Sequence, residues 1–369
     1  MENYLLSIVI ATKGREFFCQ KCVEVMLSFI TDNTQIIISD NSNSNKLSDF
    51  ISKYNDRRIN YRHTDGNLIM SENYNLALSM ATGDYICMIG DDDIVLPSIY
   101  KAIEFAIEKK TDCITQAKVI NYIWPFNNSN GTIYLPKFTN KDKEIFFKDK
   151  IINYFKNGCC VNPRDFSLPS IYHGIVKKET LDKVKEQTGL YINGISPDSY
   201  MAVALCQVIN SQYELDYPFT IGGACPGSAT VSNMKGEHSG ALENSIQYLM
   251  NIGKGYVWSI KVPKYYSVQT IWADSSLQAD YGKYLEKYFN LEKLTSRAIV
   301  ENRGMVGYIM SQTRKVNKVN LILIINDVVK LLAHKVKKRI IVGEKEDIKM
   351  IDNLGEIENV IKVVEKNCF

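Results

Sequence analysis

The sequence has little net charge, no long apolar run and few histidines. Its 44 basic and 41 acidic residues leave a net charge of +3 over 369 residues, which argues against a dedicated nucleic-acid binder, because such proteins usually carry a strong basic excess. It has no stretch of about 18 apolar residues, so we expect no transmembrane helix. The N-terminus has Glu2 where a signal peptide has basic residues, and its apolar run, 5–11, is too short for a secretory signal. We therefore expect a cytoplasmic protein.

The nine cysteines do not follow the pattern of a disulfide framework or a zinc site. Cys19 and Cys22 form the single C-x-x-C, Cys159 and Cys160 are adjacent, and the four histidines are scattered along the chain. A structural zinc site needs a second pair of such ligands, so we do not expect one. An odd number of cysteines fits a reducing compartment, where thiols stay free.

Short apolar runs alternate with amphipathic segments over the first 123 residues. The apolar runs predict strands, and apolar residues spaced along one helix face predict helices. Strands and helices in alternation predict an α/β fold with a mostly parallel sheet flanked by helices. The predicted strands are 5–11, 35–39, 58–62, 84–89 and 112–123, and the predicted helices are 16–30, 46–54, 71–82 and 97–109.

The remainder divides into two further parts. Residues 124–240 begin with an inserted loop that contains one helix and end in a small, polar, glycine-rich segment, 223–240, which is typical of a mobile loop. Between them the pattern predicts strands near 165–178 and 213–223 and helices at 179–187 and from Pro197 or Asp198. Residues 241–369 are predicted to be mainly helical.

Three consecutive carboxylates, Asp91, Asp92 and Asp93, directly follow the apolar run 84–89. Such charges repel by roughly a kcal/mol per pair even in solvent, which a surface turn tolerates and a bound divalent cation would remove. Two other polar clusters, 12–15 and 39–45, also follow predicted strands. Ligands of open α/β sheets bind beyond the carboxyl ends of the strands. The convergence of three clusters there favours a binding site over a solvated turn.

These segments together resemble the family 2 glycosyltransferases of the GT-A fold. "SIVIATKGR" (7–15), "IIISDNS" (36–42) and "NYNLALSMATGDYICMIGDDDIVLP" (73–97) occur in the family's order and spacing and cover about residues 5–100. The "GDDD" form, with a later Pro-Asp that opens a helix, resembles a bacterial branch associated with surface polysaccharides. The resemblance implies a Rossmann-like nucleotide-sugar-binding part in 1–123, an acceptor-binding part in 124–240 and a helical C-terminal extension in 241–369.

The implied activity is an inverting, metal-dependent transfer of a sugar from a nucleotide-sugar, most simply a UDP-sugar. The acceptor would be a hydroxyl of a glycan or a lipid-linked molecule in bacterial surface polysaccharide synthesis. A Mn²⁺ or Mg²⁺ ion would stabilise the departing diphosphate. Residues carried over from the family for nucleotide-sugar binding are Ala11, where the family usually has proline, Thr12, Arg15, Asp40, Asn41, Asn73, Asp91 and Asp92.

The register of the metal ligands within the triple aspartate stays open. Counting back from Pro97 places the family's metal-binding aspartate on Asp92, whereas the literal Asp-x-Asp spacing selects Asp91 and Asp93. All three are therefore candidate metal ligands.

Asp198, in "ISPDSYMAVAL", resembles the family's general base, which takes the proton of the acceptor hydroxyl. The alternative is a helix N-cap, a role that aspartate also fills well. His173 would contact the acceptor or be a core histidine. His238, in the glycine-rich segment, would close onto the diphosphate, bind the metal or be exposed.

Residues 320–342 have apolar side chains at helical spacing followed by a run of basic residues. A basic amphipathic helix either lies on an anionic membrane surface, here the inner face of the cell membrane, or packs against the catalytic part or a second subunit. The pattern leaves both interpretations open.

Two other functions compete with sugar transfer. A sugar nucleotidyltransferase would normally carry a glycine-rich phosphate loop after the first strand, and "ATKGREFF" has only Gly14. A catalytically inactive nucleotide- or glycan-binding module is disfavoured by the intact acidic cluster and Asp198.

Overall fold

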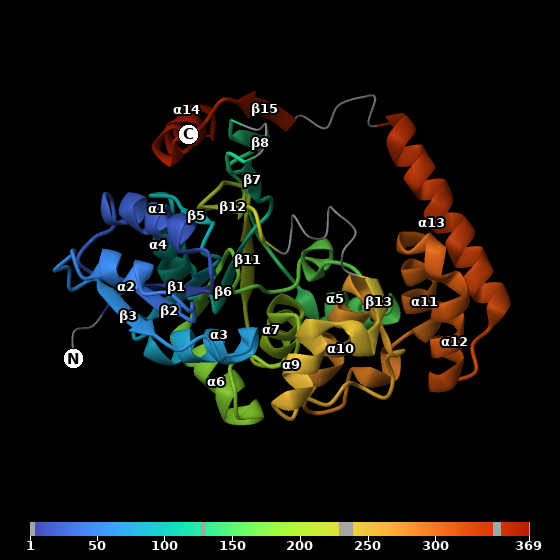
Figure 1. Ribbon diagram of the computed structural model, residues 1–369. Helices are drawn as coiled ribbons and strands as arrows, with labels where there is room; N and C mark the ends of the chain where they lie inside the picture. The colour runs from blue at the N-terminus through green and yellow to red at the C-terminus, as the bar shows by residue number, and fades with distance from the viewer. Residues whose placement is uncertain (1–3, 127–129, 229–238, 342–347, 369) are drawn as a thin grey trace.

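The computed structural model describes residues 4–126, 130–228, 239–341 and 348–368. Its centre is an eight-stranded mixed sheet with the strand order β3-β2-β1-β4-β10-β6-β11-β9 (Figure 1). The four strands β3, β2, β1 and β4 are parallel. The eight strands are β1 (Leu6–Thr12), β2 (Thr34–Asp40), β3 (Ile59–His63), β4 (Tyr85–Ile89), β6 (Cys113–Gln116), β9 (Asp142–Glu144), β10 (Gly174–Lys177) and β11 (Gln212–Leu215).

The sequence explains the central strands directly. Every residue of β1, β2 and β4 is buried, as expected for parallel strands that are covered on both faces. The predicted α/β class with flanking helices is confirmed. Cys19 and Cys22, on α1, are completely buried in the core beneath that helix. The helices of this part are α1 (Glu16–Leu27), α2 (Lys46–Ile51), α3 (Met70–Met80) and α4 (Ile99–Lys109).

A second sheet has the order β15-β8-β7-β12-β5. The chain passes from the first sheet to the second three times: between β4 and β5, between β6 and β7, and between β11 and β12. The runs 112–123 and 213–223 were each predicted as one strand, but each forms two strands in different sheets. The five strands are β5 (Ile94–Val95), β7 (Ile120–Ile123), β8 (Thr132–Pro136), β12 (Thr220–Ala224) and β15 (Ile348–Asp352).

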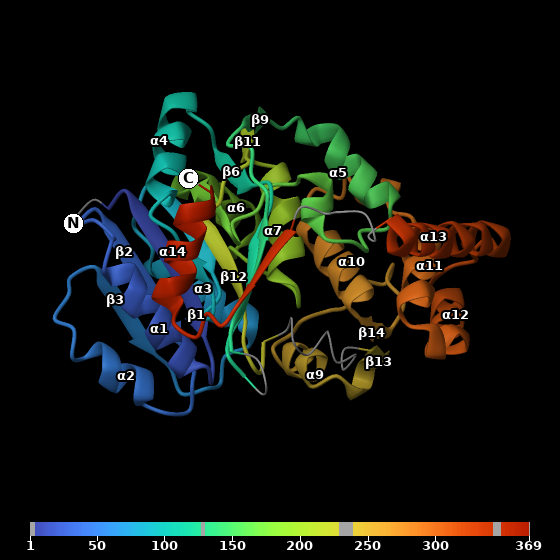
Figure 2. The same cartoon turned by 90° about the horizontal axis from the view of Figure 1, so that it is seen from above.

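The last described residues return to the N-terminal part instead of extending away from it. Strand β15 pairs antiparallel with β8, and α14 (Ile357–Cys368) packs beside α1 (Figure 2). Ile357, Val360 and Val364 recur every three or four residues, which places them on one helix face, and all three are buried in the same core as β1. Residues 348–368 thus complete the second sheet and cover the first.

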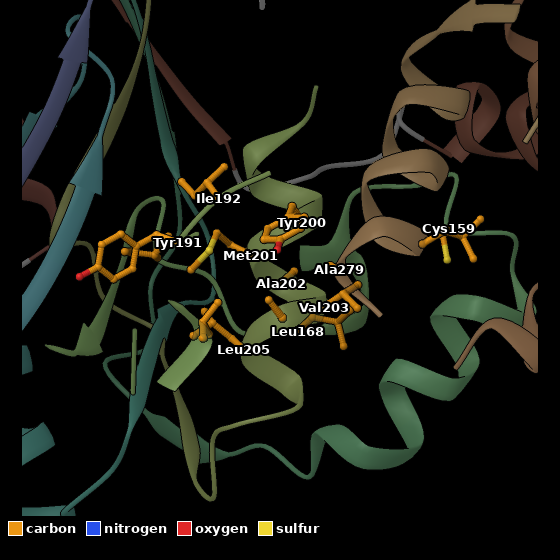
Figure 3. Packing of buried hydrophobic residues seen from close by; sticks show 14 of the residues in the cluster. Cys159, Leu168, Tyr191, Ile192, Tyr200, Met201, Ala202, Val203, Leu205 and Ala279 are labelled. Atoms are coloured by element: carbon orange, nitrogen blue, oxygen red, sulfur yellow. The ribbon is translucent and has the colours of Figure 1, made fainter. Parts of the chain in front are cut away.

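The remaining helices form the other side of the molecule, where α5, α6 and α10 pack around α7, and α12 and α13 pack against α11 (Figures 1 and 2). Eight of the ten residues of α7 are buried, and Figure 3 shows Tyr200, Met201 and Val203 packed among neighbouring side chains. The position of α7 is therefore fixed by its core contacts. The elements of this part are α5 (Phe147–Lys156), η1 (Pro163–Phe166), α6 (Lys178–Thr188), α7 (Pro197–Cys206), β13 (Ser239–Ala241), η2 (Leu242–Asn244), α9 (Ile246–Gly253), β14 (Tyr265–Ser267), α10 (Val268–Ala279), η3 (Glu286–Tyr288), α11 (Leu291–Glu301), η4 (Arg303–Met305), α12 (Val306–Val316) and α13 (Leu321–Ile341).

Candidate active site

The three aspartates occupy the first crossing between the sheets, directly after β4. We call residues 90–93 the acid loop. Its carboxylates are buried: the exposed fractions are 0% for Asp91, 3% for Asp92 and 2% for Asp93. Because this loop passes between two sheets, its charges are not on the surface, which rules out the solvated turn.

Asp91 is bound to the loop that follows β1. Thr12 Oγ1 donates a hydrogen bond to Asp91 Oδ2 at 2.6 Å, and Arg15 Nη2 lies 2.6 Å from Asp91 Oδ1. Burial is the largest influence on the pKa of Asp91 and raises it. The positive charge of Arg15 lowers this pKa, and the negative charge of Asp92 raises it. The family's predicted nucleotide residues Thr12 and Arg15 therefore hold this carboxylate in place.

Asp93 is fixed from the opposite side. Its oxygens accept hydrogen bonds from the backbone N–H groups of Gly90 (2.6 Å) and Gly223 (2.7 Å) and from the Tyr172 hydroxyl (2.6 Å). His173 Nε2 lies 3.2 Å from Asp93 Oδ2. Burial opposes ionisation, but the charge and hydrogen bonds of these partners lower the pKa of Asp93 to about 2.

Asp92 is the least engaged of the three. Its Oδ2 accepts from the Cys225 backbone N–H at 3.0 Å, whereas its Oδ1 is 3.6 Å from Arg15 Nη1. Asp92 also lines a cavity, described below. Burial and the charge of Asp93 raise the pKa of Asp92, so a cation beside it would favour its ionised form.

These contacts bear on whether a divalent cation fits the site. Within the described ranges, no three His, Cys, Asp or Glu side chains are arranged to hold a metal ion together. Mg²⁺ at phosphate sites is usually bound by one or two carboxylates, with phosphate and water oxygens supplying the rest. Asp92 fits that role best, because it accepts fewer short hydrogen bonds from the described residues than Asp91 and Asp93 do.

The other residues predicted at the nucleotide lie at the carboxyl ends of β1 and β2. Asp40 is buried, and its carboxylate accepts from Ser42 N (2.9 Å) and from the Tyr61 hydroxyl (2.8 Å). Asn41 bonds Leu68 and Thr64, and Asn73 connects Ser39 with the Thr12 carbonyl. Ala11 is buried within β1 beside Ser39 of β2. These contacts order the rim of the sheet, and the roles of these residues in nucleotide binding stay predictions.

Asp198 lies at the start of α7, across a cavity from the acid loop. The helix is capped by Ser196, whose side chain accepts from Ser199 N, so Asp198 is not the N-cap. Asp198 is exposed, and it lines both of the cavities that flank the start of this helix. Desolvation by the protein atoms around the carboxylate raises the pKa of Asp198, and the charges of Arg164 and His173 oppose that rise.

The two cavities meet at Asp198. The first, of about 400 Å³, is also lined by Arg15, Tyr74 and Asp92. The second, of about 640 Å³, is lined by Asn121, Arg164 and His173. Both are bounded by Tyr172, Asp198 and Gly223. Asp198 therefore lies at the boundary between the first cavity, which Asp92 lines, and the second cavity.

Two residues of this arrangement escaped the sequence analysis. The Tyr172 hydroxyl donates a hydrogen bond to Asp93. Arg164 lines the second cavity, and its Nη2 donates to the Tyr172 carbonyl. The buried Nη1 of Arg164 has no hydrogen-bond partner among the described residues. Both come from the segment 162–173, where only η1 and irregular backbone precede β10. Nothing in the local pattern could have revealed them, because Asp93, to which Tyr172 donates, and Asp198, on which the charge of Arg164 acts, are each more than 30 residues away in the chain.

Two histidines, His173 and His238, were candidate site residues. His173 is 5% exposed, bonds Thr220 Oγ1 through Nδ1 at 2.9 Å, and lines the second cavity. It thus combines a satisfied, buried position with access to the predicted acceptor side. His238 lies outside the described residues.

Gly223 allows β12 to pass against the acid loop. A Cβ atom at this position would lie 1.8 Å from the Asp92 carbonyl oxygen, whereas one at Gly222 would meet the Val119 side chain at 3.3 Å. We expect Gly223→Ala to lower the free energy of unfolding by about 1–3 kcal/mol, because backbone would have to move. Gly222→Ala is the matched control and should cost much less. Denaturant unfolding of both variants tests this, and equal losses would contradict it.

Comparison with known proteins agrees with this geometry. Residues 7–167, which contain β1 to β4 and the acid loop, match the family described as glycosyl transferase family 2. We call this matched stretch the family 2 domain. The Asp198 helix and all of the C-terminal part lie beyond the matched region.

Relatives of the family 2 domain include two bacterial proteins. Glycosyltransferase GlyG of Streptococcus pneumoniae is 23% identical over 190 residues, which cover 50% of this chain and 60% of that protein. The putative colanic acid biosynthesis glycosyl transferase WcaA of Escherichia coli K12 is 32% identical over 156 residues, 41% of this chain and 55% of the relative. The chain thus spans little more than half the length of the curated relatives it matches.

A solved structure with partial likeness is that of Staphylococcus aureus TarS 1-349 in complex with UDP-GlcNAc. The TM-score is 0.48 at 12% identity, over 84% of this chain and 89% of that one.

Proposed function

We propose that this chain is an inverting glycosyltransferase that moves a sugar from a nucleotide-sugar, a UDP-sugar, to a hydroxyl group. The acceptor class we propose is a glycan or lipid-linked molecule of bacterial surface polysaccharide synthesis. The family 2 domain supports the reaction class, and the relative WcaA, named for colanic acid biosynthesis, supports the acceptor class.

The observation that carries the proposal is the position of Asp198 between the two cavities. Inversion requires the acceptor hydroxyl to attack the anomeric carbon from the side opposite the leaving diphosphate. The donor would occupy the first cavity, beside Asp92, and the acceptor would enter through the second. A base that borders both cavities can reach the hydroxyl where the two substrates meet.

In this reaction Asp198 accepts the hydroxyl proton as the new bond between acceptor oxygen and anomeric carbon forms. The bond between that carbon and the phosphate oxygen breaks, and the nucleotide diphosphate leaves with the electron pair. Thr12 and Arg15 keep the acid loop in position through Asp91. Tyr172 and His173 do the same through Asp93.

Asp92 would hold a Mn²⁺ or Mg²⁺ ion together with substrate oxygens. Such an ion supplies positive charge that stabilises the departing diphosphate. Arg15, which lines the same cavity, adds a permanent cation on that side.

Arg164 is proposed to keep Asp198 ionised. The groups whose charges act on Asp198 are Arg164, His173 and Asp93, and burial is the largest influence on its pKa. A base must be deprotonated, so activity falls as the pH drops through its pKa. Arg164→Met removes an attractive charge, raises that pKa further, and should move the acid limb of the kcat/KM profile to higher pH. Arg164→Lys keeps the positive charge and should shift the acid limb less. If the pH profiles of Arg164→Met and the wild type coincided, Arg164 would not keep Asp198 ionised.

Product analysis with a panel of nucleotide-sugars tests the proposed function. Sugar transfer releases a nucleoside diphosphate, which a coupled assay detects. A nucleotidyltransferase would instead form or consume pyrophosphate, and an inactive binding module would release neither. Release of pyrophosphate, or no release with any donor that binds, would overturn the proposal.

A further inference from the structure

Helix α13 lies at the edge of the molecule with one side against α11 (Figure 1). Ile324 is 3% exposed on that inner side. Two ion pairs join the same side to α11: Lys293 Nζ lies 2.7 Å from Asp327 Oδ1, and Lys335 Nζ lies 2.6 Å from Glu301 Oε2. The orientation of the helix is therefore set by contacts along its length.

The opposite side carries a row of exposed aliphatic side chains. Ile322, Ile325, Val329 and Val336 are 70%, 61%, 59% and 56% exposed. Their spacing of three, four and seven residues places them on one face of an α-helix. No described residue covers this row, and contiguous exposed apolar surface of this kind marks an interaction site.

A second row, of basic residues, runs along the flank of the apolar one. Lys330, His334 and Lys337 are spaced by four and three residues and so share a face. Lys330 and His334 line a hollow of about 490 Å³, together with Lys293 and Arg297 of α11 and the carboxylates Asp165 and Asp327. The helix therefore presents an apolar row beside a row that carries Lys330 and Lys337.

The charge of the whole chain is concentrated in this helix. Residues 321–341 contain five lysines and arginines and one acid, a net charge of +4, against +3 for the complete chain. The rest of the chain is thus close to neutral. A partner that complements α13 must combine apolar surface with negative charge.

We propose that α13 binds the surface of a bilayer that contains anionic lipids. The apolar row enters the boundary between headgroups and acyl chains, and the basic row faces the lipid phosphates, as in other amphipathic membrane-surface helices. A second copy of the chain is a poorer occupant, because pairing through this face would bring two helices of +4 charge together. The helices of the described parts are all too short or too polar to cross a membrane, which is compatible with surface binding.

Vesicle co-sedimentation of the full chain, without any donor or acceptor, tests this inference separately from sugar transfer. The probes are vesicles of phosphatidylcholine alone and of equal parts phosphatidylcholine and phosphatidylglycerol. We expect binding to the anionic vesicles only, weakened by salt. Lys330→Gln with Lys337→Gln should reduce the partition coefficient about 30-fold, because each lysine near an anionic surface contributes about 1 kcal/mol to membrane binding. Ile325→Asn with Val329→Asn should abolish binding.

Matched controls use equally exposed residues elsewhere. Ile246 and Ile260 are 77% and 87% exposed outside α13, so replacing both with Asn tests surface apolarity alone, and Lys141→Gln with Lys148→Gln tests net charge alone. Both control pairs should bind vesicles like the wild type, and circular dichroism should show all variants folded. Equal binding to neutral vesicles, losses as large in the controls, or no vesicle binding would overturn the proposal. Sedimentation velocity provides one further test. If the wild type formed a dimer and the Ile325→Asn, Val329→Asn variant were a monomer, the proposal would also be overturned, because this face would then serve self-association.

Discussion

Asp92→Asn should reduce sugar transfer by about 10³-fold or more while leaving the protein folded. The loss corresponds to several kcal/mol of transition-state stabilisation, the scale of a metal ion at a leaving group. The fold should survive, because an Asn oxygen can still accept from Cys225 N, and because losing one buried negative charge relieves repulsion with Asp93. Thermal unfolding and initial rates with a donor that turns over measure the two effects.

Asp93→Asn is the matched comparison, since the change in charge is identical and the contacts differ. An Asn amide at this position would point a donor at one of the groups that now donate to Asp93: Gly90 N, Gly223 N or the Tyr172 hydroxyl. We therefore expect Asp93→Asn to lower the free energy of unfolding by about 1–3 kcal/mol. The two substitutions together separate the carboxylate proposed to bind the ion from one that holds the loop.

A readout that does not depend on catalysis is UDP affinity with and without Mn²⁺, measured by calorimetry. Mn²⁺ should tighten UDP binding to the wild type and have little effect on Asp92→Asn. Wild-type transfer rates in EDTA, or an Asp92→Asn variant that still responds to Mn²⁺, would rule out this role for Asp92.

The parallel half of the sheet was predictable because its signals are local. The strands β1, β2 and β4 are buried runs rich in apolar residues, and the acid loop follows β4 directly, so strand order alone brings Thr12, Asp40 and Asp92 to one edge. The acidic cluster and the motifs around it identified the family before any contact was known.

The remainder depends on contacts between residues far apart in the chain. The runs 112–123 and 213–223 each change sheets midway, and the turn that separates the two strands has no strong local signal. Strand β15 and helix α14 are joined to the N-terminal part through β8 and α1, partners more than 200 residues away. For the same reason Tyr172 and Arg164, which complete the candidate site, could be found only in three dimensions.

The roles of the three aspartates also needed the structure. Spacing treats them as equivalent, and it left both registers open. Their partners make them different: Asp91 is paired with Arg15, Asp93 accepts several hydrogen bonds, and Asp92 is held less closely by the described residues, with its Oδ1 3.6 Å from Arg15 Nη1. Hydrogen-bond satisfaction therefore distinguishes residues that sequence position does not.

Asp198→Asn should lower sugar transfer by about 10²–10⁴-fold, the usual contribution of a positioned general base, while UDP binding stays unchanged. The side chain keeps its size, and the helix keeps its cap, because Ser196 and not Asp198 caps α7. Single-turnover rates and calorimetry with UDP measure the two quantities on the same preparations. The variant should also lose the acid limb of the pH profile, which a change in folding would not remove selectively.

Ser196→Ala is the structural control for this variant, since it removes the cap two residues before Asp198 and leaves the carboxylate in place. Ser196→Ala should lower the free energy of unfolding by about 1 kcal/mol. Its loss of sugar transfer should be much smaller than that of Asp198→Asn. Asp165→Asn tests a further carboxylate that lines the second cavity, which is also lined by Asp93. If Asp198→Asn transferred sugar at the wild-type rate and Asp165→Asn did not, the base would be Asp165, and the acceptor would lose its proton within the second cavity, away from its boundary with the first. If Asp198→Asn alone loses transfer, the proton leaves the acceptor at the boundary between the two cavities, where the sugar must pass from one substrate to the other.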